Sequence, residues 1–235
     1  MLILSLDTTS RGGSVAIVDG GEVVCLRGGD PARTHGERLP MDLASACEAA
    51  GVRIGDIDLF AVAAGPGSFT GLRIGIATVQ GLAMARNRRV VPVSALEAVA
   101  AAAGAGPGVA GLRAARIAAW IDALRGEVFA QVFEGSGPIS EVVAAAPLTV
   151  VASHRGILDG AEFHGDGAVR YREEILAAIG GPVRVAEDVP LLAGAIGLIA
   201  ARQPGRAVLP HAVVPIYVRR PDAEIARGRE RAAER

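Results

Sequence analysis

Hydrophobic residues in the first hundred positions fall into short runs separated by glycine and polar residues. Apolar runs of about four to eight residues are typical of β-strands, and longer stretches with a period of about 3.6 are typical of helices. The predicted strands span residues 2–6, 14–18, 22–27, 57–64 and 90–93. The predicted helices span residues 39–50, 72–86 and 94–103. A meander followed by alternating helices and strands predicts an α/β fold with a mixed sheet.

The second half of the chain repeats this pattern. An apolar run at residues 117–121 ends at Asp122, and a turn leads into an alternating strand at residues 127–133. The first predicted strand likewise ends at Asp7, before a turn and a second strand. Further helices are predicted at residues 170–179 and 191–201, with a short strand at 183–185. The repetition predicts a duplicated fold with a cleft between its halves.

Glycine and alanine from Gly104 to Gly111 interrupt all periodicity, so the predicted domain boundary lies there. We expect an N-terminal domain at residues 1–104, a second domain at 105–205 and a C-terminal segment at 206–235. The end of that segment, from Asp222, mixes arginine with glutamate, which is typical of a solvated or disordered tail. The stretches around His154 and at residues 163–167 have the composition of polar turns, and we assign them no chemistry.

The densest motif is Gly65-Pro66-Gly67-Ser68-Phe69-Thr70-Gly71-Leu72-Arg73-Ile74-Gly75, between a predicted strand and a predicted helix. Amides at a helix start can bind an anion, and glycine allows close backbone approach. The motif is not a P-loop, because the chain contains no lysine, and Ser68 lacks the flanking glycines of a nucleophile elbow. Two interpretations of the motif stay open. The first is a dinucleotide-binding turn from Gly65 to Gly71, with arginines 86, 88 and 89 near a ribose 2′-phosphate. The second is a tight turn that packs the helix on the sheet.

The bend after the first strand is rich in hydroxyl groups and glycine. Its candidate nucleotide-binding residues are Asp7, Thr8, Thr9 and Ser10. The superfamily of acetate kinase, sugar kinases, Hsp70 and actin holds phosphate at a similar bend. Those proteins usually place a glycine close after the aspartate, which this chain does not. A degenerate phosphate loop and a capped hairpin bend are both compatible with these residues.

The predicted helix at residues 72–86 is apolar on several sides, so more than one of its faces needs cover. One face can pack on the sheet, and the rest either packs against the helix at residues 39–50 or meets another chain. The candidate partner-contacting residues are Leu72, Arg73, Ile76, Val79, Gln80 and Met84. We expect a homodimer through this face when the chain is alone.

The composition of the chain argues against polyanion binding, a metal site and membrane contact. The 235 residues carry a formal net charge of −1, so no polyanion-binding character is evident, although all 24 basic residues are arginine. Cys25 and Cys47 form no CxxC pair, and the residue four after His35 is a leucine, so no metal site is predicted. His35 is interpreted as a solvated or capping residue. The chain shows neither a long uncharged apolar run nor a signal peptide, which predicts a cytoplasmic protein without membrane contact.

The glycine-rich motif resembles the signature of the TsaB family, the smaller partner in bacterial tRNA threonylcarbamoyladenosine synthesis. Three further segments support the resemblance in the same order along the chain, namely residues 6–10, 121–129 and 215–219. The resemblance implies a two-domain duplicated actin/Hsp70/sugar-kinase-like (ASKHA) fold with mixed sheets and flanking helices. It also implies a TsaD-like catalytic subunit and a TsaE-like P-loop ATPase as partners, with tRNA bound only through the complex.

The catalytic relative TsaD carries His-Leu-Glu-Gly-His at a strand-to-helix junction and binds a metal there. The corresponding segment here is Ala95-Leu96-Glu97-Ala98-Val99, which lacks both histidines. The resemblance therefore implies a non-catalytic paralogue with no catalytic residue, no metal and no cofactor of its own, and with ATP or ADP at most at the complex interface. The alternatives are an independent small-molecule kinase or NADP-dependent enzyme that uses the loop from Gly65 to Gly71, and a peptidase, against which the lack of a metal pair and of a nucleophile counts.

Overall fold

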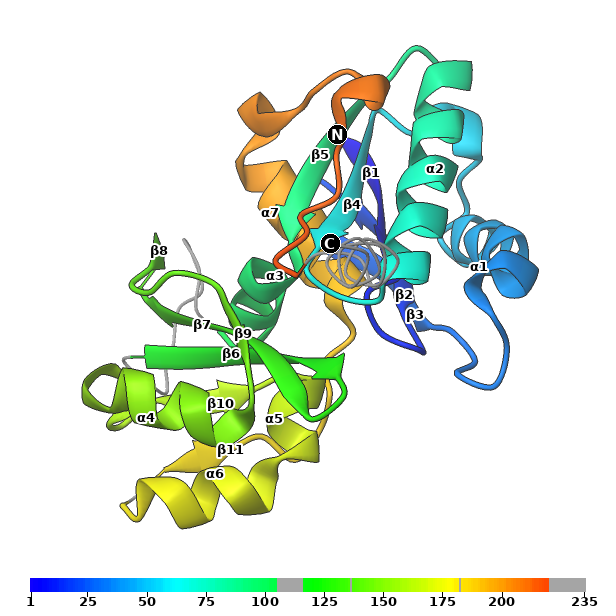
Figure 1. Cartoon of the computed structure of the whole chain (residues 1–235). Helices are drawn as coiled ribbons and strands as arrows, with labels where there is room; N and C mark the ends of the chain where they lie inside the picture. Colours follow the sequence, from blue (N-terminus) through cyan, green and yellow to red (C-terminus); the bar gives the residue numbers. More distant parts are fainter. Residues whose placement is uncertain (105–115, 136, 182, 220–235) are drawn as a thin grey trace, which may run out of the picture.

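Two mixed β-sheets form the framework of the chain (Figure 1). The computed structural model describes residues 1–104, 116–135, 137–181 and 183–219. The first sheet has the order β3-β2-β1-β4-β5 and consists of β1 (Leu2–Asp7), β2 (Ser14–Asp19), β3 (Glu22–Gly28), β4 (Leu59–Gly65) and β5 (Arg89–Ser94). β1, β2 and β3 are antiparallel, whereas β4 and β5 run parallel to β1. The predicted meander and the predicted strands at residues 57–64 and 90–93 are confirmed.

Helices cover both faces of the first sheet. One face carries α1 (His35–Ala49) and α2 (Phe69–Ala85), and the other carries α3 (Ala95–Ala102) and α7 (Leu192–Arg202). Because side chains alternate along a strand, Leu4 and Leu6 pack towards α1 and α2, whereas Ile3 packs towards α3 and α7. This cover on both sides explains why β4 is buried along its whole length.

The second sheet has the order β11-β10-β6-β7-β8, with β9 also paired to β7. Its strands are β6 (Arg116–Leu124), β7 (Glu127–Glu134), β8 (Gly137–Pro138), β9 (Val143–Ala145), β10 (Glu162–His164) and β11 (Arg184–Val185). β6 and β7 are antiparallel, and β10 and β11 run parallel to β6. The sequence β7-β6-β10-β11 thus repeats the order and directions of β2-β1-β4-β5. The predicted duplicated α/β fold is confirmed.

Two predicted turns are wrong. His154 lies in α4 (Pro147–Leu158), and residues 163–167 form the end of β10 and the start of α5 (Asp166–Arg170). The helix predicted over 170–179 is divided at Tyr171 into the end of α5 and α6 (Arg172–Ile179). The polar residues Ser153, His154 and Arg155 in the middle of α4 concealed its apolar side, on which Val150, Val151 and Leu158 are buried. Three short 3-10 helices complete the described elements: η1 (Ile54–Asp56), η2 (Pro204–Arg206) and η3 (Pro210–Ala212).

Helix α7 belongs to the first half by its packing, although it lies within the expected second domain of residues 105–205. Ser5 of β1 donates its hydroxyl to the carbonyl oxygen of Ala193 at 2.7 Å, and the Ala193 amide donates to Ser14 of β2 at 3.0 Å. Gly197 permits this approach, because a Cβ there would lie within 3.0 Å of Val18 and Ser5. The predicted boundary after Gly104 and the tail from residue 222 lie outside the described residues.

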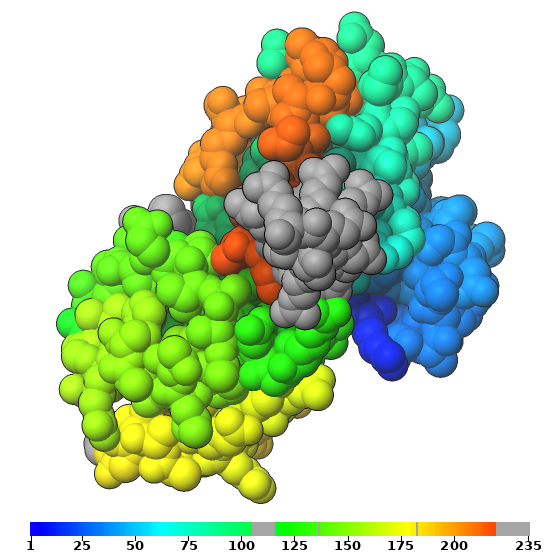
Figure 2. Space-filling model, in the orientation of Figure 1, coloured from blue at the N-terminus to red at the C-terminus, as the bar shows by residue number. Residues whose placement is uncertain are grey.

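The last described residues, 207–219, return across the first half and are called the C-terminal strap (Figures 1 and 2). Val208 exchanges two backbone hydrogen bonds with β5, and the Ile216 amide donates to the carbonyl of Ala64 in β4 at 2.6 Å. Arg219 pairs with Glu127 of β7 at 2.8 Å. The strap therefore contacts the first sheet and then the second, as the orange and red segment in Figure 2 shows.

Candidate functional site

The start of α2 lies directly against the bend that follows β1. Gly71 faces the carbonyl oxygen of Thr8 and Gly75 faces its hydroxyl, and a Cβ on either glycine would lie within 3.0 Å of those atoms. The Ser68 amide donates to the carbonyl of Thr9 at 2.9 Å. Of the two interpretations of the glycine-rich motif, the geometry favours the tight turn, because the chain's own threonines occupy the space that the glycines leave.

Asp7 organises the bend from a buried position. Its Oδ1 accepts hydrogen bonds from the amide of Thr9 at 2.8 Å and from the Thr9 hydroxyl at 2.6 Å. Burial raises the pKa of Asp7, and the two bonds from Thr9 oppose that shift. The Thr8 hydroxyl is buried without a hydrogen-bond partner among the described residues. The structure thus brings Asp7, Thr8, Thr9 and Ser10 together as a capped bend.

His35 and Arg38 of α1 hold the outer side of this bend. His35 Nε2 lies 2.9 Å from the carbonyl oxygen of Ser10 and must donate to it, so Nδ1 accepts from Arg38 at 2.8 Å. Arg38 also donates to the carbonyl of Gly12 and to Asp42. The interpretation of His35 as a solvated residue is wrong, because its ring is buried between α1 and the bend. Burial and the charge of Arg38 lower the pKa of His35.

This lowered pKa predicts a pH dependence of stability. The unfolded chain binds a proton at His35 with a pKa of about 6.5, whereas the folded chain holds the ring neutral to lower pH. The stability contributed by His35 should be complete above pH about 6.5 and be lost as the pH falls towards the folded-state pKa. Urea unfolding at several pH values measures this loss. A His35→Gln variant, which does not titrate, should lose less stability over the same range, and parallel profiles would contradict the assignment.

Asp166, at the start of α5, lies across the junction of the two halves from Asp7. Its Oδ1 accepts from the amide of Asp122 at 3.0 Å, and Asp122 pairs with Arg170 at 2.7 Å. Burial raises the pKa of Asp166, and the nearby negative charges of Asp122 and Asp7 also raise it. Sequence reasoning found Asp122 but missed Asp166, which the Gly-Asp-Gly pattern at residues 165–167 could have indicated.

The space between these acids is small. A cavity of about 20 Å³ lies between Ser10 and Asp166, with Val99, Ile121 and Pro190 in its walls. That volume holds about one water molecule, whereas sites for small ligands measure roughly 300–1,000 Å³. The two halves therefore meet closely at the ends of β1 and β6.

The structure buries some of the predicted partner-contacting residues and exposes others. Leu72, Ile76 and Val79 are buried in the chain itself, so their side chains face its core and not its surface. Ile76 and Val79 point towards the sheet because one side of a helix repeats every three to four residues, and they join its core cluster. Gln80 is half-buried and donates to two carbonyl oxygens near η3.

The outward side of α2 is a row of exposed residues that we call the α2 ridge, consisting of Phe69, Arg73, Ala77, Gly81 and Met84. Of the candidate partner-contacting residues, Arg73 and Met84 are exposed. The ridge combines two small residues in its middle with larger apolar residues at its ends. On the neighbouring α1, Met41 and Ala44 are also exposed. Such a surface allows another helix to approach closely.

The start of α3 carries residues 95–99, the segment for which the resemblance implies that two metal-binding histidines have been lost. Ala95 and Val99 are buried, and Glu97 pairs with Arg206 at 2.7 Å. Within residues 1–104, 116–135, 137–181 and 183–219, no group of three His, Cys, Asp or Glu side chains could hold a metal ion. Nor does that part of the chain contain a helix long and apolar enough to cross a membrane.

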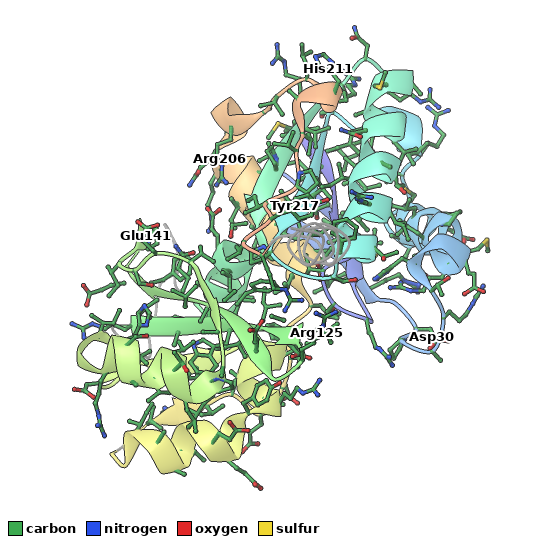
Figure 3. The ribbon with its side chains drawn as sticks, viewed as in Figure 1. Asp30, Arg125, Glu141, Arg206, His211 and Tyr217 are labelled. Atoms are coloured by element: carbon green, nitrogen blue, oxygen red, sulfur yellow. The ribbon has the colours of Figure 1, made fainter. Side chains whose placement is uncertain are left out.

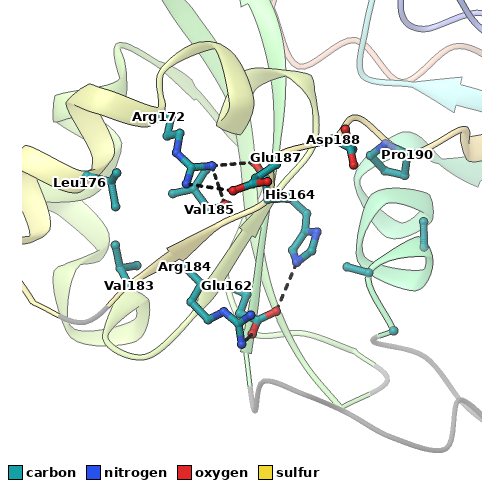
Figure 4. Close-up of a pocket in the computed structure, with 14 residues that line it drawn as sticks. Glu162, His164, Arg172, Leu176, Val183, Arg184, Val185, Glu187, Asp188 and Pro190 are labelled. Carbon is teal, nitrogen blue, oxygen red and sulfur yellow. Dashed lines mark hydrogen bonds and ion pairs between the residues drawn. The ribbon is translucent and has the colours of Figure 1, made fainter.

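A larger hollow of about 860 Å³ lies beside β10, β11 and α6 (Figure 4). Several of its charged side chains pair within the chain, since Glu162 lies 3.4 Å from Arg184 and Arg172 lies 3.9 Å from Glu187. Arg172 donates to the carbonyl of Val185 at 2.9 Å. Because these groups are engaged with the chain itself, the hollow has the character of a solvated sheet face.

The topology and the Asp7 bend define a protein of the actin, Hsp70 and sugar-kinase fold class. A ROK hexokinase from Thermus thermophilus shares the fold with a TM-score of 0.50 at 14% identity, over 87% of this chain and 99% of that chain. An activator of 2-hydroxyisocaproyl-CoA dehydratase from Clostridium difficile, solved with bound ADPNP, gives a TM-score of 0.50 at 13% identity, over 88% and 97%. At such identities the likeness shows the fold alone.

The chain belongs to the TsaB/YeaZ family. The family model described as TsaD, tRNA N6-adenosine threonylcarbamoyltransferase, matches residues 30–159. An uncharacterized Pseudomonas aeruginosa protein with similarity to peptidase YeaZ gives a TM-score of 0.75 at 30% identity, over 93% of this chain and 99% of that chain. The tRNA threonylcarbamoyladenosine biosynthesis protein TsaB of Escherichia coli K12 is 37% identical over 129 residues, which are 55% of this chain and 53% of that protein. The chain thus spans about half the length of the curated relatives that it matches.

Proposed function

We propose that this chain is a non-catalytic subunit of the assembly that adds threonylcarbamoyl to the adenosine at position 37 of tRNA. Its partners would be a TsaD-like catalytic subunit and a TsaE-like P-loop ATPase in the cytoplasm, with tRNA bound only by the complex. The observation that carries the proposal is the start of α3, where buried Ala95 and Val99 stand at the positions that match the relative's two metal-binding histidines. Without those ligands, the first coordination shell of that metal site is missing.

Two features support a structural role over an independent kinase or NADP-dependent enzyme. The cavity at the Asp7 bend has a volume of about 20 Å³, far below that of a nucleotide site. In the loop from Gly65 to Gly71, Gly67 accommodates Thr9 and Gly71 accommodates Thr8 of the same chain. Any ATP or ADP in the assembly would therefore bind at the interface with the catalytic subunit.

The α2 ridge, together with the exposed part of α1, is the proposed contact surface. It is used by a second copy when the chain is alone and by the catalytic subunit in the complex. The small side chains of Ala77 and Gly81 favour close helix packing, and Phe69 and Met84 supply apolar contact. The chain would act by stabilising the state of its partner that binds tRNA and nucleotide.

Reconstitution tests the proposal. A mixture of the catalytic subunit, the ATPase, ATP, threonylcarbamoyl-AMP and tRNA should form modified adenosine when this chain is present and only at background rate when it is omitted. Mass analysis of nucleosides after digestion of the tRNA provides the readout. Equal turnover in the two mixtures would refute the role.

A further inference from the structure

Two motifs that lie far apart in the sequence, at residues 65–75 and 215–219, meet at the start of α2. The rings of Phe69 and Tyr217 lie with their centroids 5.3 Å apart. The guanidinium carbon of Arg73 lies 4.1 Å from the centre of the Phe69 ring, and Arg73 Nε donates to the Tyr217 hydroxyl at 3.3 Å. Figure 3 labels Tyr217 near the start of α2. Arg73 is thus supported by one ring and hydrogen-bonded to the other.

This arrangement leaves most of the guanidinium available. Nη1 and Nη2 of Arg73 have no hydrogen-bond or ion-pair partner among the described residues. The remaining donors form the planar fork that matches a carboxylate with two parallel hydrogen bonds. Because the rings already limit the motion of the side chain, less conformational entropy is lost when that fork binds.

We propose that Arg73, positioned by Phe69 and Tyr217, is the receptor for a carboxylate side chain of the catalytic partner, and that the C-terminal strap is part of the contact surface. The inference rests on the proposed function and names the chemistry that the partner must present. Val214 and Ile216 of the strap are exposed apolar residues, as is Tyr217. A buried arginine contact surrounded by apolar residues is typical of the few positions that dominate interface affinity.

Charge complementarity favours the catalytic partner over a second copy. α2 contains no acidic residue. On α1, Glu37 accepts from Thr34 at the helix start and Asp42 is paired with Arg38, which leaves Glu48 at the far end. Among the acids of α1 and α2, a second copy would therefore offer Arg73 only Glu48 without a described partner, whereas a catalytic partner with its own acid at this position would satisfy the fork.

The test compares the dissociation constants of complexes with the catalytic subunit, measured by calorimetry without nucleotide or tRNA. Arg73→Ala should weaken binding at least tenfold, and Arg73→Lys nearly as much, because lysine offers neither fork nor flat stacking. Tyr217→Phe should weaken binding about threefold, since it removes only the hydroxyl. Arg155→Ala, at an exposed arginine on α4, is the matched control and should bind like the wild type. Circular dichroism checks that each variant is folded.

Every other outcome overturns a specific part of the proposal. Wild-type affinity of Arg73→Ala would refute the receptor while leaving the proposed function intact, and failure of the wild type itself to bind would refute both. Wild-type affinity of Arg73→Lys would show that a point charge is sufficient and would refute the claim that the guanidinium fork binds the carboxylate. If the Arg73 variants weaken binding only when nucleotide or tRNA is added, the ligand of Arg73 is a phosphate group and not a carboxylate of the partner. An equal weakening of the homodimer would assign it to a second copy.

Discussion

Ala77→Glu is expected to weaken association with the catalytic subunit by about 100-fold or more. Ala77 is exposed in the middle of the α2 ridge, so the free chain can solvate the new carboxylate and should fold normally. In the complex, the same charge would be buried against an apolar surface without a partner. Calorimetric titration of the folded variant into the catalytic subunit measures the change.

The control is the preceding residue. Ile76 is buried in the core of the first half, so Ile76→Glu should unfold the chain instead of changing only its association. The two variants thus separate the surface side of α2 from its core side. A folded Ala77→Glu variant that binds with wild-type affinity would show that the α2 ridge is not the contact surface.

Gly71→Ala should destabilise the fold, whereas Gly81→Ala in the same helix should stabilise it. A Cβ on Gly71 would lie within 3.0 Å of the Thr8 carbonyl oxygen, and a displaced backbone typically costs about 1–3 kcal/mol. A Cβ on Gly81 would meet no atom within 4 Å, so alanine there should add about 1 kcal/mol through its higher helix propensity.

Thermal unfolding of the two variants distinguishes these effects. For a chain of this size, each kcal/mol corresponds to roughly 2–4 °C in Tm, so the two variants should move in opposite directions. A rise in Tm for Gly71→Ala would mean that α2 and the Asp7 bend are not in the close contact described here.

Much of the fold follows from local patterns. The mostly apolar run at residues 57–64 predicted β4, because a strand covered on both faces needs no polar side. The repeated strand-aspartate-turn-strand pattern predicted the duplication, which the shared strand order confirms. Helix α4 was missed, since its exposed side contains Ser153, His154 and Gly156, which are common in turns.

The site depends on contacts between distant residues, and local patterns do not reveal these. An apolar residue on a helix can face its own core or a partner, and only the tertiary structure placed Leu72, Ile76 and Val79 in the core. The assignment of α7 to the first sheet likewise depends on the small residues that let it approach β1 and β2. The contact of Tyr217 with Arg73 spans 144 positions and has no signature in either segment alone.

The most direct measurement of the central claim is a titration of this chain into a fixed amount of catalytic subunit, ATPase and tRNA, with the rate of adenosine modification as readout. The account predicts a rate that rises and saturates near one chain per catalytic subunit, no stimulation by Ala77→Glu, and no product from the chain alone. Full stimulation by Ala77→Glu, or product formed by this chain without the catalytic subunit, would contradict it.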